Sequence, residues 1–191
     1  KRVTAVKTYD FAYGHGRKTF DYDENLVIKE VRTEEFPVME DVKAGVLDAI
    51  YHPIGCKPIN EIVKPGDTVA FICNDPTRVA NSFDFMPVLV DEMNKLGVKD
   101  EDMHILFSLG THRDMTHEEM VEAVGENVAS RLKMYNSTCT KQEDFEYFGT
   151  TSRGTPVWIN KHICHVDHVI MTGTIVHHYF SGYGGGRTGN L

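Results

Sequence analysis

Residues 64–97 read "KPGDTVAFICNDPTRVANSFDFMPVLVDEMNKLG", and this stretch decides the fold. The turn formers Pro65 and Gly66 precede an apolar run at 68–73, which is typical of a strand buried on both faces. After a polar loop, apolar residues recur at helical spacing up to Gly97: Phe85, Leu89, Met93 and Leu96. The stretch therefore predicts a strand, a loop and a helix in succession.

A similar pattern follows along the chain. An apolar run at 104–109 leads through the loop "GTHRDMT" to a helix that the capping-box pair Thr116 and Glu119 opens. Its apolar face consists of Met120, Val124, Val128 and Leu132. After a polar and less regular stretch, a third apolar run at 168–173 enters a glycine-rich loop. This alternation predicts an α/β fold: a mostly parallel, Rossmann-like sheet with helices on both faces.

The N-terminal part of the chain has a different pattern. Residues 5–16 and 26–32 alternate between apolar and polar side chains, which predicts a small N-terminal β unit. A helix then ends before Pro53, with one apolar face made of Val42, Val46, Ala49 and Ile50. A length of 191 residues with 41% hydrophobic content suffices for one core, so we expect a single α/β domain over residues 1–191.

The composition narrows the possible partners. A net charge of -8, from 20 basic and 28 acidic residues, opposes binding to nucleic acid or to an anionic membrane. No apolar run is long enough for a membrane helix, and the N-terminus lacks an apolar signal segment. The four cysteines form no C-x-x-C pair, which suits reduced thiols. We therefore expect a cytoplasmic protein with a small-molecule partner.

Three loops with reactive side chains follow the three predicted strands, at 74–78, 110–116 and 177–187. Ligands of parallel sheets bind beyond the carboxyl ends of the strands. We therefore expect these loops to share one site.

The first loop contains Asp75, Pro76, Thr77 and Arg78. The planar fork of Arg78 suits a carboxylate or a phosphate, and Asp75 can orient Arg78 or a neighbouring imidazole. The alternative is a local turn, because Asp and Pro are common turn formers.

The other two loops carry histidines. His112 lies between a strand end and a helix N-terminus, a position that favours a neutral imidazole able to act as a base; the alternative is a capping or local pairing role. His177 and His178 open the glycine-rich loop, whose spacing matches neither a dinucleotide fingerprint nor a P-loop, so a flexible surface loop is the alternative there. We exclude the "HICHVDH" stretch at 162–168, because no second ligand cluster has zinc-like spacing.

Two histidines across one pocket, with an arginine for a carboxylate, are the minimum for removing hydrogen from one face of a carbon and returning it to the other. This pattern is typical of a racemase or epimerase. The Cα–H of a 2-hydroxy acid is poorly acidic, so a hydride-accepting cofactor would help.

The stretches "HPIGCKPINEIVKPGDTVAFICNDPTR", "GTHRDMTHEE" and "GTIVHHYFSGYGGGR" together resemble the N-terminal domain of the nickel-dependent lactate racemase family. The resemblance runs from about Tyr13 to Arg187. It implies a racemase or epimerase of lactate-type 2-hydroxy acids, with His112 and His178 as the catalytic acid/base pair. It also implies that residues 75–78 contact a nickel pincer nucleotide, nickel pyridinium-3,5-bisthiocarboxylic acid mononucleotide, which accepts a hydride from the substrate.

The chain departs from the family pattern at its end. Thr188 stands where the family has the lysine that carries the cofactor, so the resemblance does not extend to covalent attachment. The family's nickel-binding histidine and C-terminal domain lie beyond Leu191, and no metal ligand is assigned in this chain. We expect a part of a longer racemase that is inactive alone and self-associates through exposed apolar surface. The alternative is a non-catalytic module that binds a small anion or a nucleotide.

Overall fold

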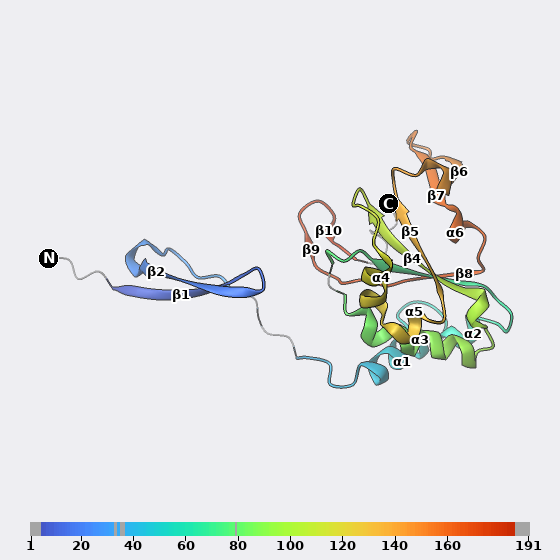
Figure 1. Cartoon of the computed structure of the whole chain (residues 1–191), viewed down its shortest axis with the longest axis horizontal. Helices are drawn as coiled ribbons and strands as arrows, with labels where there is room; N and C mark the ends of the chain where they lie inside the picture. Colours follow the sequence, from blue (N-terminus) through green and yellow to red (C-terminus); the bar gives the residue numbers. More distant parts are fainter. Residues whose placement is uncertain (1–4, 33, 35–36, 79, 186–191) are drawn as a thin grey trace. The chain divides into compact units, whose positions relative to one another are not determined.

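The computed structural model describes residues 5–32, 34, 37–78 and 80–185 (Figure 1). The chain divides into two compact units, Lys1–Val38 and Met39–Leu191, and we describe each by itself. The expectation of a single domain over residues 1–191 stays a prediction.

The first unit is an antiparallel hairpin of β1 (Val6–Tyr13) and β2 (Gly16–Asp23), followed by the short helix η1 (Glu24–Leu26). Gly14, with φ 57°, lies in the two-residue turn between the strands, where a positive φ matches the strand twist. The predicted N-terminal β unit is confirmed. Its second strand was placed wrongly at 26–32, because the chain reverses at once after Tyr13.

The second unit is built on a four-stranded parallel sheet with the strand order β5-β4-β3-β8. The central strands are β3 (Val69–Asn74) and β4 (Met103–Gly110), and the outer strands are β5 (Lys133–Thr138) and β8 (His168–Met171). The three apolar runs that the sequence marks as strands are therefore β3, β4 and β8. The prediction of an α/β fold with a mostly parallel sheet is confirmed.

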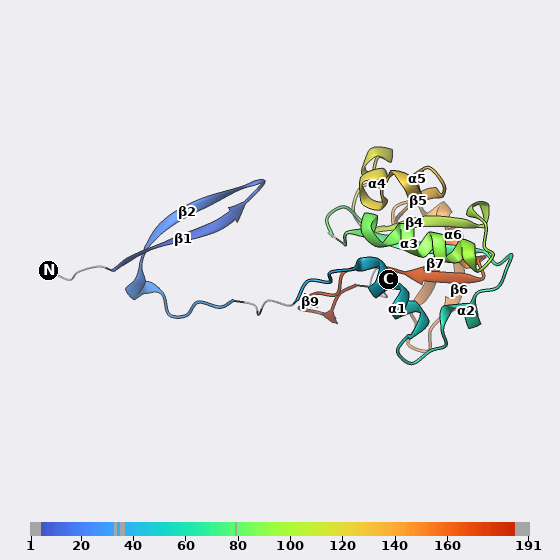
Figure 2. The same ribbon diagram turned by 90° about the horizontal axis from the view of Figure 1, so that it is seen from below.

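Most helices lie on one side of the sheet. They are α1 (Val42–Tyr51), α2 (Ile59–Ile62), α3 (Ser82–Lys95), α4 (His117–Val124) and α5 (Glu126–Ala129). Figure 1 shows α1, α3 and α5 on one side of the strands, with α6 (Lys161–Cys164) and the hairpin of β6 (Phe145–Thr150) and β7 (Pro156–Asn160) on the other. Figure 2 gives the view from below, from the side of α1 and α3. The core between sheet and helices contains fully buried side chains such as Phe71, Phe107, Met86 and Met93.

Contacts of His162 hold α6 on the second face. Its ring stacks on Tyr135 of β5 with 3.7 Å between the ring centroids. Its carbonyl oxygen lies 2.7 Å from Nε2 of His104 on β4. Both partners belong to the face of the sheet opposite α3, since side chains alternate along a strand.

Helix starts and stops follow the sequence closely. Thr116 Oγ1 accepts a hydrogen bond from the Glu119 N–H, and the Glu119 side chain accepts one from the Thr116 N–H, so the predicted capping box is present. Gly125 then separates α4 from α5, where the sequence predicts one continuous helix. The predicted apolar face still packs into the core on both sides of this break, because Met120, Val124 and Val128 are all buried.

A buried carboxylate joins α1 to α3. Glu92 is 5% exposed; its Oε2 accepts from Lys95 Nζ at 2.6 Å, and its Oε1 accepts from Tyr51 Oη at 2.5 Å. These hydrogen bonds, from Lys95 first and Tyr51 second, lower the pKa of Glu92.

We expect the Glu92→Gln substitution to lower the free energy of unfolding by about 1–3 kcal/mol at pH 7. Because the pKa of Glu92 is lower in the folded state, this contribution is complete above the unfolded pKa of about 4.3 and is lost as the pH falls through the folded value. Urea unfolding of both proteins at pH 7 and near pH 3.5 measures it. Glu101→Gln, at an exposed ion pair, is the control. An equal difference at both pH values would contradict the prediction.

Candidate active site

The candidate site lies at the carboxyl edge of the parallel sheet. Since β4, β3 and β8 are neighbours and parallel, the loops that follow them leave the sheet at one edge. The loops after β3 and β4 contact each other directly, through Asp75 and His112.

The loop after β3 is a tight turn closed by Asp75. Oδ1 of this buried carboxylate accepts from the Thr77 N–H at 2.7 Å and from Thr77 Oγ1 at 2.5 Å. The Arg78 N–H donates to the Asp75 carbonyl oxygen at 3.1 Å. These residues thus form a turn, their role in a site stays a prediction, and Oδ2 of Asp75 is left for another partner.

That partner is His112. Its Nδ1 lies 3.3 Å from Asp75 Oδ2, and its N–H donates to the Leu109 carbonyl oxygen at 2.9 Å. The His112 side chain is 46% exposed, whereas that of Asp75 is 8% exposed. A buried carboxylate therefore lies against one ring nitrogen of a half-exposed imidazole.

Arg113, unlike the neighbouring His112, pairs with a residue of the following helix. Its guanidinium donates to both oxygens of Glu119, at 2.8 and 2.6 Å. Hydrogen bonds from Arg113 and from the Thr116 backbone lower the pKa of Glu119 to about 2. The pair ties the loop after β4 to the first turn of α4.

A pocket of about 300 Å³ opens beside the turn, between the start of α3 and α4. Arg78 lines it, and among the described residues its side chain has no hydrogen-bond or ion-pair partner. Ser82 and Phe83, the first residues of α3, also line the pocket, and no side chain caps this helix start. The remaining lining residues are Asn74, Asp75, Pro76, Ala80, Asn81, Glu119, Glu122 and Ala123.

The glycine-rich loop forms a small hairpin of its own, from β9 (His177–His178) and β10 (Gly182–Tyr183). Nδ1 of His178 accepts from the backbone N–H groups of Phe180 and Ser181, both at 3.2 Å. Gly185, with φ 94°, packs so tightly that a Cβ there would lie 2.4 Å from the Thr174 carbonyl oxygen. This part of the loop packs against its own chain.

The structure joins Asp75, Thr77 and His112 by direct contacts and places Arg78 at the adjacent pocket. His178 contacts residues of its own hairpin, so its role as partner of His112 stays a prediction. Arg187 and Thr188 lie outside the described residues. Sequence reasoning missed Glu119 and the open start of α3 as parts of the pocket; the capping-box motif marked Glu119 only as a helix signal.

The excluded histidines have structural partners. Nε2 of His165 lies 2.9 Å from Glu146 Oε2, and Nε2 of His168 lies 2.8 Å from Asp67 Oδ2. Within residues 5–32, 34, 37–78 and 80–185, no group of three or more His, Cys, Asp or Glu side chains is arranged to hold a metal ion. None of the helices in that part of the chain is long and apolar enough to cross a membrane.

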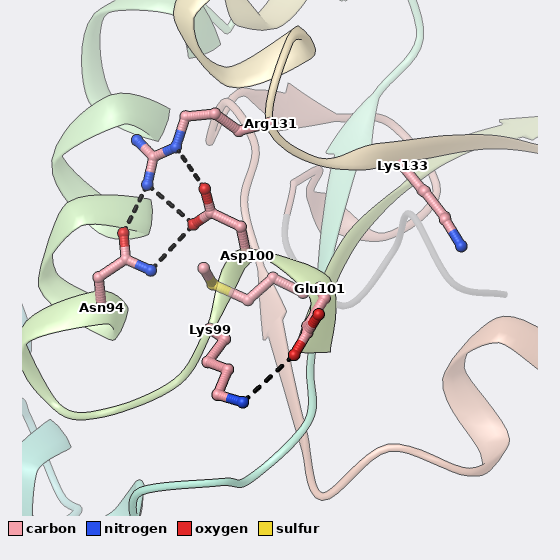
Figure 3. A pocket seen from close by; sticks show the side chains of 7 residues that line it. Asn94, Lys99, Asp100, Glu101, Arg131 and Lys133 are labelled. Atoms are coloured by element: carbon pink, nitrogen blue, oxygen red, sulfur yellow. Dashed lines mark hydrogen bonds and ion pairs between the residues drawn. The ribbon is translucent and has the colours of Figure 1, made fainter.

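A second pocket, of about 730 Å³, lies at the amino ends of β4 and β5 (Figure 3). Arg131 donates there to Asp100 and Asn94, as Figure 3 shows, and also to Asp91. Hydrogen bonds from Arg131 and Asn94 lower the pKa of Asp100. These polar groups satisfy one another, so the network joins α3 to the turn before β5 and leaves few donors for a ligand.

Comparison with known proteins identifies the family of the chain. Residues 13–191 match the family model described as "Lactate racemase N-terminal domain". The chain is 28% identical over 180 residues to a lactate racemase from Thermoanaerobacterium thermosaccharolyticum, covering 93% of this chain and 42% of that protein. It is 29% identical over 136 residues to a lactate racemase from Lactiplantibacillus plantarum, covering 71% of this chain and 32% of that protein.

The fold matches a solved structure as well. The lactate racemase apoprotein from T. thermosaccharolyticum superposes with a TM-score of 0.81 at 27% identity, covering 97% of this chain and 43% of that one. The chain thus spans less than half the length of these relatives. With the parallel sheet in place and the family model matched along nearly the whole sequence, the chain belongs to the lactate racemase N-terminal domain family.

Proposed function

We propose that this chain supplies acid/base and anion-binding groups of a racemase or epimerase that acts on lactate-type 2-hydroxy acids. The observation that carries the proposal is the contact of buried Asp75 with half-exposed His112, beside a pocket lined by Arg78. A carboxylate behind an imidazole is the usual arrangement for a histidine that takes a proton. The His112 side chain is 46% exposed, which leaves it accessible to a substrate hydroxyl.

In the proposed reaction His112 takes the hydroxyl proton of the substrate, and Asp75 stabilises the resulting imidazolium. When bound, the nickel pincer nucleotide of the family would supply a hydride acceptor for the substrate Cα–H, and Arg78 with the start of α3 would hold its phosphate. His178 is proposed to serve the hydroxyl of the opposite enantiomer. When one enantiomer is converted to the other, the first histidine keeps the substrate proton as an imidazolium, the second donates a proton to the product oxygen, and proton exchange with water restores both rings.

The residues of the pocket fit a bound nucleotide. The Arg78 guanidinium donors have no partner among the described residues, and the first N–H groups of α3, which no side chain caps, lie at a helix N-terminus that favours anions. Glu119 and Glu122 also line the pocket, and the charge of Glu119 is balanced by Arg113. We therefore assign the phosphate of the nucleotide to Arg78 and the start of α3, with residues 75–77 shaping the turn. Thr188 does not offer the amine that a covalent link needs, so we derive no step from such a link.

The Arg78→Ala substitution is expected to weaken binding of nicotinic acid mononucleotide about 10-fold or more, because a charge-assisted hydrogen bond contributes roughly 1.5–3 kcal/mol. Isothermal titration calorimetry of this chain measures the effect. Arg153→Ala, in the exposed loop before β7, is the matched control and should bind as the unchanged chain does. Equal affinities of the Arg78 variant and the unchanged chain would remove the assignment.

A second function deserves testing because of Thr188. A chain without the lysine can hold an anion or a nucleotide and perform no catalysis. In that case nicotinic acid mononucleotide or sulfate still binds at Arg78, while a protein that contains this chain interconverts no 2-hydroxy acid. Racemisation by such a protein would exclude the binding-module alternative.

We propose a cytoplasmic protein without nucleic-acid or membrane partners, which the net charge of -8 and the free cysteines support. Self-association is supported by the exposed side chains of Val169 and Met171 on the outer strand β8.

A further inference from the structure

We infer that the two histidines rest in opposite tautomers: His112 carries its proton on Nδ1 and His178 carries its proton on Nε2. The inference concerns the protonation of the free protein, and its catalytic meaning rests on the proposed function. It makes Asp75 a positioning residue for His112.

The tautomer of His112 follows from the partners of the two carboxylate oxygens of Asp75. Thr77 donates to Oδ1 of Asp75 through both its N–H and its hydroxyl group, so Oδ1 is occupied. Oδ2 remains, 3.3 Å from Nδ1 of His112. At this distance an ionised carboxylate oxygen repels a ring lone pair and attracts an N–H group, so the neutral imidazole favours the tautomer with its proton on Nδ1. Nε2 of His112 is then left with a lone pair, as a base requires.

The state of His178 follows from two backbone donors. The N–H groups of Phe180 and Ser181 both point at Nδ1, each with a nitrogen–nitrogen distance of 3.2 Å. A ring nitrogen that receives two N–H groups is an acceptor and carries no proton of its own. The proton of the neutral ring is therefore on Nε2. The ring is also stacked on that of Tyr179, with centroids 5.0 Å apart and 9° between the planes.

The two sides of the site are therefore unequal before substrate binds. His112 is ready to accept a hydroxyl proton at Nε2, and the imidazolium that results is balanced by Asp75. His178 offers an N–H to a substrate oxygen instead. Before His178 accepts a proton at Nε2, its own proton must move to Nδ1, and that requires Phe180 and Ser181 to release the ring. Racemisation started from the enantiomer that needs His178 as the base therefore includes an added rearrangement of the 178–181 turn.

The test is the ¹⁵N chemical shift of each ring nitrogen, from long-range ¹H–¹⁵N correlation spectra of this chain at about pH 8.5, where ordinary histidines are neutral. His112→Gln and His178→Gln variants assign the two rings. We expect the downfield shift of an unprotonated nitrogen at Nε2 of His112 and at Nδ1 of His178. A proton on Nε2 of His112, or on Nδ1 of His178, would overturn the inference.

Asp75→Asn tests the positioning role. The Thr77 N–H still requires an oxygen at Oδ1, so the new amide presents its NH₂ group to His112 Nδ1. The His112 proton should then move to Nε2 and its shift pattern should invert, whereas Asp84→Asn, at an exposed carboxylate in the first turn of α3, should change nothing. An unchanged pattern in Asp75→Asn would overturn the role of Asp75. The ¹⁵N shifts of the unchanged chain decide the two tautomers even if the Asp75→Asn variant folds poorly.

The outcome is separate from that of the proposed function. Opposite tautomers in a protein that does not racemise lactate would contradict the proposed function and leave the inference standing. Racemisation by a protein whose two histidines share one tautomer would contradict the inference and leave the proposed function standing.

Discussion

The His112→Ala substitution is expected to lower the interconversion of lactate enantiomers by about 10²–10⁴-fold in an active protein that contains this chain, which is the range for loss of a general acid or base. His112 is the imidazole that a buried carboxylate contacts, and its side chain is 46% exposed. Alanine leaves no group to take the hydroxyl proton, so the loss should appear in kcat and in both directions of the reaction. Chiral chromatography of the products measures it.

His117→Ala is the matched control for this prediction. His117 is the first residue of α4, five positions along the same segment, and its side chain is exposed. Its removal should leave the rate within a factor of about two. Near-normal racemisation by the His112 variant would contradict the acid/base role.

The Phe107→Ala substitution is expected to lower the free energy of unfolding by about 3–5 kcal/mol. Phe107 lies in the central strand β4, is 0% exposed, and belongs to the core between the sheet and the helices. Alanine leaves a cavity beside side chains that are fixed by the sheet, so the site cannot collapse fully. The expected fall in Tm is roughly 6–20 °C for a chain of this size.

Thermal and urea unfolding, followed by circular dichroism, measure this effect. Phe148→Ala is the control, because Phe148 on β6 is 53% exposed and loses little buried area. A decrease below about 1 kcal/mol in the Phe107 variant would contradict the placement of β4 at the centre of the core.

The elements predicted well are those with a complete local signal. The strand β3 and the helix α3 are bounded by turn residues and carry an unbroken apolar pattern, so their order and approximate limits follow from residues 64–97. The start of α4 follows in the same way from its capping box. Local propensity and tertiary packing agree there.

Elements that depend on distant partners were missed. Strand β5 reads "KMYNST", a run with polar residues that is a strand because it pairs with β4. The β6–β7 hairpin is half exposed and has no strong alternation to mark it. The second strand of the N-terminal hairpin was also misplaced, since the apolar residues of 26–32 gave a stronger local pattern than "GRKTFDYD".

In the candidate site, too, some features follow from the local sequence and others depend on the folded structure. The carboxyl ends of neighbouring parallel strands explain why Asp75 and His112 meet, and the sequence offered Asp75 as support for a neighbouring imidazole. The sequence does not reveal which oxygen of Asp75 is free, because that depends on the fold of the Asp75–Thr77 turn. The backbone donors to His178 are likewise visible only in the folded 178–181 turn.

Racemisation of [2-²H]lactate in ordinary water tests the central claim most directly. The substrate is one pure enantiomer, the protein is an active form that contains this chain, and chiral chromatography with mass spectrometry follows the products. Hydride transfer and return, with His112 handling only the hydroxyl proton, predicts both enantiomers with deuterium retained at Cα. Unchanged substrate, or a product enantiomer that has lost its deuterium to water, would contradict the account.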